Sequence, residues 1–275
     1  MNSLKKTLVL VAGISAVLTL SAGVWAEGKK IVFGVAPGPY GDLVKLAIKP
    51  GLEKKGYTVE LKEFSDYVQP NLALANKSID VNVFQHRAYL EKFSSDKGLK
   101  LSQLITIPTA SLGVYSKKFK SVADIQDGSS VTIANDPTNL TRALQYLQTL
   151  GLIKIKSNID PTKASEKDVA ENPKNLKIRP IEAAQLPRSI ESVDFSIVNG
   201  NYAIAAGIWS TALGREILTE NHINLVAVRT EDLESQFAKD IKAVVESKEF
   251  LSVVDDPKNV FKDFQKPEWL KAKGK

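Results

Sequence analysis

Aromatic and polar side chains gather in two short stretches of the sequence, residues 64–71 and 83–90. Both stretches directly follow apolar runs typical of β-strands, and open α/β sheets bind ligands just past the carboxyl ends of their strands. Four side chains there could together wall an apolar slot with polar tips: Tyr67, Phe84, His86 and Tyr89. Taken singly, a histidine or phenylalanine at such a position is more often part of a structural core.

A third stretch, residues 135–142, places a cation near the start of a predicted helix. Asn139 or Thr138 can cap that helix, and Arg142 then lies in its first turn, where the helix end is already positive. A ligand carboxylate would relieve this conflict, because arginine holds carboxylates by a planar two-bond fork. The alternative is a surface ion pair with a nearby Asp or Glu.

Several kinds of chemistry lack the residues they need. The chain has no cysteine and only two histidines, which argues against thiol nucleophiles, thiolate zinc sites and multi-histidine metal sites, so no cofactor or metal is expected. No Gly-x-Ser-x-Gly elbow occurs, and the glycine-rich loop at residues 34–41 has neither the dinucleotide nor the P-loop pattern. That loop could turn backbone amides toward an anion, or could be a plain strand-to-helix turn.

The whole chain has the composition of a globular protein. Its 275 residues are 43% hydrophobic and 25% charged, and the formal charge of +6 is scattered without basic runs, which disfavours nucleic-acid binding. The first 26 residues combine Lys5 and Lys6 with an uncharged stretch and the small-residue ending Val24-Trp25-Ala26, the pattern of a cleaved secretory signal peptide. The alternative for this segment is a buried N-terminal helix.

Apolar runs and helical periodicities alternate along the rest of the chain. Strands are predicted at residues 30–35, 58–62, 79–84, 130–134, 195–198 and 223–228. Helices are predicted at residues 43–55, 71–76, 139–150 and 231–245, with Gly151 ending the third. The alternation predicts an α/β protein of two lobes, each with a mixed, mostly parallel sheet flanked by helices, joined by two or more crossings.

These segments resemble the NlpA-type family of methionine-binding lipoproteins, which are substrate-binding proteins of ABC importers. The resemblance begins with the stretch that contains Phe84-Gln85-His86 and Tyr89. It extends to Gly34–Pro39, Asp66-Tyr67 with Pro70-Asn71, Asn135-Asp136-Pro137 with Asn139 and Arg142, Leu186-Pro187-Arg188, and Val198–Ala203. It therefore spans nearly all of the chain after the signal segment, in the family's order.

The resemblance implies roles for nine residues. Tyr67, Phe84, His86 and Tyr89 would surround the side chain of an amino-acid ligand, and Arg142, which follows Asn139 in the third motif, would take its carboxylate. Asn201 and Asn224 would hold the amino and carboxylate groups, whereas Asn199 would contact the ligand or support its loop. The full set of ligand-binding residues expected is Tyr67, Phe84, His86, Tyr89, Asn139, Arg142, Asn199, Asn201 and Asn224.

The family's fold is a two-lobed clamshell of the periplasmic-binding-protein type. On that fold we expect residues 27–109 and 228–275 to form lobe 1 and residues 110–227 to form lobe 2. The implied function is that of a monomeric, non-enzymatic binding protein that captures a free amino acid, methionine first, and delivers it to a membrane permease. Another amino acid or small organic anion is the alternative ligand. A periplasmic enzyme on the same fold, with His86 as its base, is the alternative class.

Two departures from the family pattern affect these expectations. Family members usually carry a lipid-modified cysteine after the signal segment, whereas Val24 follows Leu20-Ser21-Ala22-Gly23 here. The expectation is therefore an exported protein that is free in the periplasm, without a lipid anchor. Arg87-Ala88 stands where many relatives have a proline, and Trp209 is expected close to the site.

Overall fold

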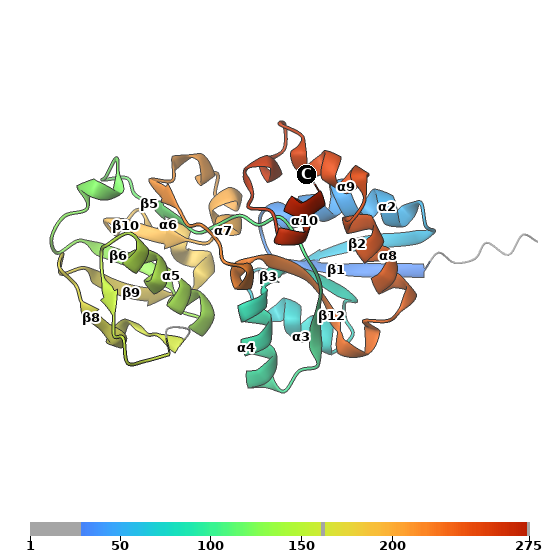
Figure 1. Cartoon of the computed structure of the whole chain (residues 1–275), viewed down its shortest axis with the longest axis horizontal. Coiled ribbons are helices and arrows are strands. Elements are labelled where there is room, and N and C mark those ends of the chain that lie inside the picture. The colour runs from blue at the N-terminus through green and yellow to red at the C-terminus, as the bar shows by residue number, and fades with distance from the viewer. Residues whose placement is uncertain (1–28, 161–162, 274–275) are drawn as a thin grey trace, which may run out of the picture.

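Two five-stranded sheets, one in each of two lobes, organise the chain (Figure 1). The computed structural model describes residues 29–160 and 163–273. The predicted signal segment, residues 1–26, lies outside them. Within the described residues, no helix is long and apolar enough to cross a membrane.

The first sheet has the strand order β2-β1-β3-β12-β4. Its strands are β1 (Lys29–Val35), β2 (Tyr57–Glu63), β3 (Val81–His86), β4 (Leu101–Thr106) and β12 (Asn224–Arg229). β1 pairs in parallel with β2 and β3, whereas β12 pairs antiparallel with β3 and β4. One reversed strand among five makes the sheet mixed and mostly parallel, as predicted.

The second sheet repeats this plan with the order β11-β5-β10-β6-β9. Its strands are β5 (Gly113–Tyr115), β6 (Ser130–Ala134), β9 (Lys177–Ile181), β10 (Phe195–Val198) and β11 (Gly214–Arg215). Only β5 runs against its neighbours, because β6 pairs in parallel with both β9 and β10. A separate two-stranded sheet joins β7 (Lys154–Ile155) and β8 (Val169–Glu171).

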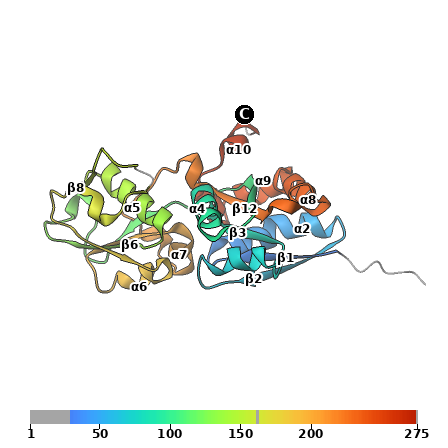
Figure 2. The same ribbon diagram turned by 90° about the horizontal axis from the view of Figure 1, so that it is seen from below.

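Helices cover both faces of the first sheet (Figure 2). They are α1 (Pro39–Leu43), α2 (Lys49–Glu53), α3 (Gln69–Ala75), α4 (Arg87–Lys97), α8 (Gln236–Val245), α9 (Lys248–Asp255) and α10 (Glu268–Lys273). In β12, Val226 and Val228 pack into the core shared with α8 and α9, whereas Leu225 and Ala227 pack into the core under α3. Alternating side chains of one strand thus supply two cores, as the period-two geometry of a strand requires.

The second sheet lies among α5 (Pro137–Thr149), α6 (Leu186–Ser189) and α7 (Gly200–Ala205). Leu144 and Leu147 of α5 share a core with Val131 and Ile133 of β6. The α6 side has no separate core: Leu186 and Tyr202 belong to the same cluster as Phe33 of β1. This shared core means that the two lobes are in direct contact.

Two predicted helices differ from the structure. The predicted helix at residues 43–55 is part of a continuous helical stretch over residues 39–53, in which a π-helical segment at Val44–Ile48 joins α1 to α2. Pro50 has no N–H to donate, and the wider turn accommodates the missing bond. The predicted helix at residues 231–245 is a short 3-10 turn followed by α8, which Ser235 caps through its side chain.

The chain passes between the lobes after β4 and again after β11, in agreement with the two crossings expected (Figure 1). The predicted lobe boundary at residues 109 and 110 lies in the first crossing. The predicted boundary at residues 227 and 228 falls inside β12, which pairs only with strands of the first sheet. We propose that lobe 1 comprises residues 29–109 and 224–273 and that lobe 2 comprises residues 110–223.

Candidate functional site

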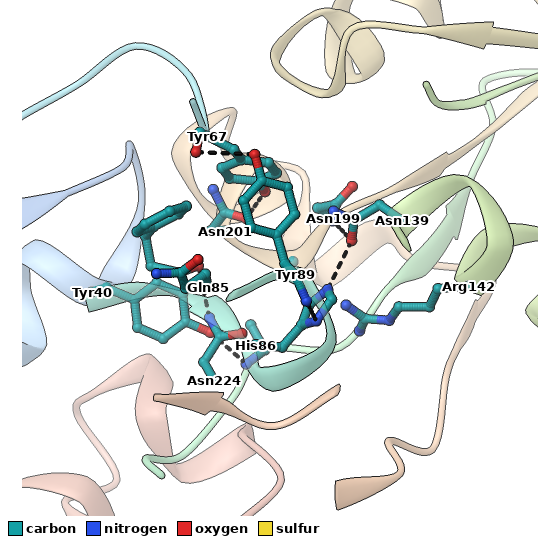
Figure 3. A pocket seen from close by; sticks show the side chains of 13 residues that line it. Tyr40, Tyr67, Gln85, His86, Tyr89, Asn139, Arg142, Asn199, Asn201 and Asn224 are labelled. Carbon is teal, nitrogen blue, oxygen red and sulfur yellow. Dashed lines mark hydrogen bonds between the residues drawn. The ribbon is translucent and has the colours of Figure 1, made fainter. Parts of the chain in front are cut away.

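A small cavity lies between the two lobes (Figure 3), and its free volume is about 20 Å³. This is about the space that one water molecule needs, so the lining side chains nearly fill the cavity. All nine residues singled out from the sequence line it, and four further residues complete it: Tyr40, Gln85, Ala110 and Gly200. The lining comes from the ends of β1, β3, β6 and β10 and from the start of β12, where an α/β sheet is expected to hold a ligand.

Three mutually contacting rings form one wall of the cavity. The ring centroid of Tyr67 lies 5.8 Å from that of Phe84 and 5.9 Å from that of Tyr89, and Phe84 and Tyr89 are 6.1 Å apart. The Tyr67 hydroxyl donates to Asn201 Oδ1 at 2.6 Å, and the Tyr89 hydroxyl donates to the backbone oxygen of Tyr67 at 3.1 Å. Because the hydroxyls are engaged within the protein, the wall offers mainly apolar ring surface.

His86 ends β3 and caps the following helix. Its Nδ1 accepts from the backbone N–H of Tyr89 at 3.1 Å, so Nδ1 carries no proton and Nε2 donates to Asn139 Oδ1 at 3.3 Å. Burial, followed by the charge of Arg142, holds the pKa of His86 well below its usual range. The imidazole is therefore neutral, and both its nitrogens are used in positioning other groups.

Asp136, and neither Asn139 nor Thr138, caps α5. Its Oδ1 accepts from the backbone N–H of Asn139 at 3.0 Å, and both its oxygens accept from Asn139 Nδ2. Asn139 Oδ1 in turn accepts from Asn199 Nδ2 at 2.9 Å and from His86. The capping prediction was wrong because the helix starts two residues earlier than expected, at Pro137, a residue type favoured at that position.

Arg142 reaches toward the cavity from α5 (Figure 3) and forms a buried ion pair. Its Nε lies 3.0 Å from both carboxylate oxygens of Glu216, and its Nη2 lies 2.6 Å from Oε2. The side chains are 4% and 10% exposed, so the ion pair is not the surface pair considered as an alternative. Arg142 is the sixth residue of α5, beyond the first turn, so its conflict with the helix dipole is weaker than expected.

Three further asparagines line the cavity, and one of them links the lobes. Asn201 Nδ2 donates to the backbone oxygen of Pro37 at 2.9 Å, which links α7 of lobe 2 to the glycine-rich loop of lobe 1. Asn224 Nδ2 donates to the backbone oxygen of Phe84 at 3.0 Å. Asn199 Oδ1 is buried and has no hydrogen-bond partner among the described residues. An unpaired buried oxygen is costly, so this atom is available to accept from a ligand.

Of the site residues that sequence reasoning missed, Tyr40 had a recognisable signal. It lies in the glycine-rich loop that the sequence analysis considered, and its buried hydroxyl accepts from the backbone N–H of Ala110 at 3.2 Å. Gln85 exchanges side-chain hydrogen bonds with Asn71, and its Nε2 also donates to Asn82 Oδ1. No sequence pattern indicated that Glu216 pairs with Arg142, because the two residues lie 74 positions apart in the sequence.

Two other features were expected near the site. Trp209 does not itself line the cavity; its ring packs against Phe264, which in turn contacts the lining residue Tyr40, and the guanidinium of Arg215 lies 3.9 Å from its centroid. The loop at residues 34–41 makes a direct contact with Asn201 in this structure. Within residues 29–160 and 163–273, no group of three or more His, Cys, Asp or Glu side chains could hold a metal ion.

Comparison with known proteins gives a consistent family. The model of the NlpA lipoprotein family matches residues 31–269. The chain is 36% identical to the probable D-methionine-binding lipoprotein MetQ of Vibrio cholerae, over 90% of this chain and 93% of that protein. It resembles the structure of a Burkholderia cenocepacia nutrient-binding protein bound to methionine, with a TM-score of 0.78, 39% identity, and coverage of 82% and 95%. It also resembles a periplasmic substrate-binding protein of an ABC transporter from Coxiella burnetii, with a TM-score of 0.79, 34% identity, and coverage of 86% and 99%.

These names contradict the expectation of a protein that is free in the periplasm without a lipid anchor. The matching family model and the Vibrio cholerae relative are both named lipoproteins, which implies lipid anchoring in this family. The sequence contains no cysteine. The expectation failed because it inferred a location from the absence of one residue type, and no location is assigned to this chain from that absence.

Proposed function

The chain belongs to the NlpA lipoprotein family, and on this basis we propose that it is the substrate-binding protein of an ABC importer for methionine. The observation that carries the proposal is the pairing of a buried guanidinium with a wall of three aromatic rings in one inter-lobe cavity. A guanidinium suits the carboxylate of an amino acid, and an aromatic wall suits a flexible thioether. A relative named for D-methionine and a similar structure bound to methionine support the same ligand.

Each group of an amino acid has a matching partner in the cavity. We assign the ligand carboxylate to Arg142 and the thioether chain to the rings of Tyr67, Phe84 and Tyr89. Sulfur–aromatic contacts contribute roughly 0.3–1.5 kcal/mol each. Asn199 Oδ1 and the side-chain amide of Asn224 face the remaining ammonium group. The side chains that make these contacts are themselves positioned by hydrogen bonds to His86, Asn139 and Asn201.

The same hydrogen bonds favour binding over catalysis. A general base needs a nitrogen that is free to take a proton, and His86 Nδ1 already accepts from the start of α4. Its Nε2 carries a proton and faces Asn139. We therefore propose that the ligand leaves the site chemically unchanged.

The position of the site between the lobes suggests how binding is signalled. Tyr67 and Pro37 of lobe 1 both bond to Asn201 of lobe 2, so closed lobes complete the cavity. A ligand that contacts both lobes biases the hinge toward this closed arrangement. We propose that the permease recognises that arrangement and that the protein acts as a monomer.

Calorimetry on the purified chain tests the proposal. L-methionine and D-methionine are titrated separately, alongside alanine and glutamate, and the ligand is recovered after denaturation and identified by mass spectrometry. We expect heat with at least one methionine enantiomer, weaker or no heat with alanine and glutamate, and recovery of unchanged methionine. Binding of glutamate or alanine without binding of methionine would contradict the ligand, and a converted product would contradict the binding function.

A further inference from the structure

The ion pair at the cavity wall involves a carboxylate that does not itself line the cavity. Glu216 lies just past β11, and both its oxygens contact Arg142. Its Oε2 also accepts from the backbone N–H of Leu112 at 3.3 Å, and its Oε1 lies 3.7 Å from His222 Nδ1. Glu216 is thus held on one side of the guanidinium, by Nε and Nη2, which leaves the Nη1 side outside the pair.

The ion pair at this wall carries no net charge. Arg142 contributes one positive charge and Glu216 one negative charge, and both are buried. Burial keeps the pKa of both His86 and His222 below the usual value, so the two imidazoles are neutral near pH 7. The other lining side chains are amides, phenols or apolar groups. Asp136, like Glu216, lies behind the lining; it is held by Asn139 and Thr138, and burial raises its pKa, which opposes a further negative charge there.

A closed cavity whose guanidinium is already paired with a carboxylate discriminates between ligands by their charge. Burying a charge that has no partner is expensive, whereas a ligand with one positive and one negative group adds no net charge to the site. If Glu216 were absent, Arg142 alone would make the cavity positive, and a simple carboxylate would then be the ligand that neutralises it.

We propose that Glu216 is a positioning residue that neutralises Arg142 and thereby restricts the site to zwitterionic amino acids, excluding anions that have the same side chain. The inference rests on the proposed function, because it requires that the ligand carboxylate meets Arg142. It assigns to the Arg142–Glu216 pair a role in specificity beyond folding.

The test compares methionine with its 2-hydroxy analogue, 2-hydroxy-4-(methylthio)butanoate, in which a hydroxyl replaces the ammonium group. Glu216→Gln keeps the size of the side chain and an oxygen that can accept from Arg142 and Leu112, but removes the charge. We expect the ratio of the two dissociation constants, hydroxy analogue over methionine, to fall by at least about tenfold relative to the unmodified chain. This change corresponds to about 1.4 kcal/mol.

Three further variants separate charge from structure. Glu216→Asp keeps the charge, so it should retain the original ratio even if both affinities fall. Asp240→Asn removes a carboxylate that bonds Tyr57 and pairs with Lys55 away from the cavity, and should change neither affinity. If Glu216→Gln does not fold, Glu216→Ala is measured with and without acetate, and acetate should restore the preference for methionine.

The outcomes of the experiment are distinct. An unmodified chain that binds methionine, together with an unchanged ratio in Glu216→Gln and no effect of acetate on Glu216→Ala, would overturn the inference and leave the proposed function intact. An unmodified chain that binds neither enantiomer of methionine would contradict the proposed function itself.

Discussion

At the scale of single residues, the arrangement around Arg142 departs most from what its sequence position indicated. The guanidinium pairs with a buried carboxylate, so the residue has a role in folding beside the role that we propose for it in binding. Buried ion pairs add little when intact, but removal of one partner leaves an uncompensated charge. Variants of Arg142 should therefore affect both properties.

We expect Arg142→Ala to weaken methionine binding by roughly two to three orders of magnitude and to lower the ligand-free free energy of unfolding by about 3–5 kcal/mol. The first effect follows from the lost contact with the ligand carboxylate, and the second follows from Glu216, which remains buried without the cation that balances its charge. Calorimetry and denaturant unfolding measure the two. Lys118→Ala, which breaks the more exposed pair with Asp194, is the control and should cost about 0–1 kcal/mol without affecting binding. Normal binding by Arg142→Ala would remove Arg142 from the site.

His222 makes stability depend on pH. Burial, then the charge of Arg142, lowers the pKa of His222 from 6.5 to about 4, against the opposing effect of Glu216. The unfolded chain takes up this proton at a higher pH than the folded chain. The contribution of neutral His222 to the free energy of unfolding is therefore fully present above pH 6.5 and is lost as the pH falls toward 4. The free energy lost approaches roughly 3 kcal/mol.

Urea unfolding at pH 7.5 and pH 4.5 measures this effect. His222→Gln should reduce the difference in unfolding free energy between the two pH values. An equal difference in the variant and the unmodified chain would assign the pH dependence to other groups, His86 first among them.

At the scale of elements, the cap of α5 links helix stability to the site. Asp136 accepts from the backbone N–H of Asn139 and also orients the side chain of Asn139, which in turn contacts His86 and Asn199. α8 has a cap of the same kind, in which Ser235 accepts from the backbone N–H of Ala238, but that helix does not line the cavity. The two caps therefore stabilise their helices in the same way, and only the cap of α5 also contacts the site.

Asp136→Ala and Ser235→Ala should each lower the free energy of unfolding by about 0.5–2 kcal/mol, the usual effect of a lost cap. Only Asp136→Ala should also weaken methionine binding, because Asn139 then loses the acceptors that orient it. Thermal unfolding and calorimetry on both variants check this. Equal affinities in the two variants would show that the orientation of Asn139 does not matter to the ligand.

At the scale of the whole molecule, the closed arrangement depends on the close approach of two backbones from different lobes. Gly38 has a φ of 116°, and a Cβ atom built on it would lie 2.4 Å from the backbone oxygen of Asn201. Neither the conformation nor the space suits a side chain. Gly128 also has a positive φ, of 72°, but a Cβ atom there would meet nothing within 4 Å.

Gly38→Ala should therefore hinder closure and weaken methionine binding at least tenfold, whereas Gly128→Ala should lower the melting temperature and leave binding unchanged. Small-angle scattering with saturating methionine should show a larger radius of gyration for Gly38→Ala than for the unmodified chain. Tight binding and full compaction in Gly38→Ala would mean that the contact between Gly38 and Asn201 is not needed for closure.

Much of the architecture follows from patterns that act over a few residues. The apolar runs at residues 130–134 and 195–198 coincide with β6 and β10, and the strands predicted near residues 30, 58, 79 and 223 shift by at most two residues at either end. Burial of alternating or continuous apolar side chains is a local requirement, so it can be recognised locally. The motifs at the ends of these strands were also recognisable, since strand ends meet at one edge of a sheet.

Contacts between distant parts of the chain could not be read in this way. Nothing near Arg142 indicates that its partner is Glu216, and nothing near Gly38 indicates that Asn201 approaches it. The first pairing forms when the chain after β11 packs against α5 within lobe 2, and the second forms only when the two lobes meet. The charge balance and the size of the cavity depend on these long-range contacts, and for that reason tertiary structure alone decided them.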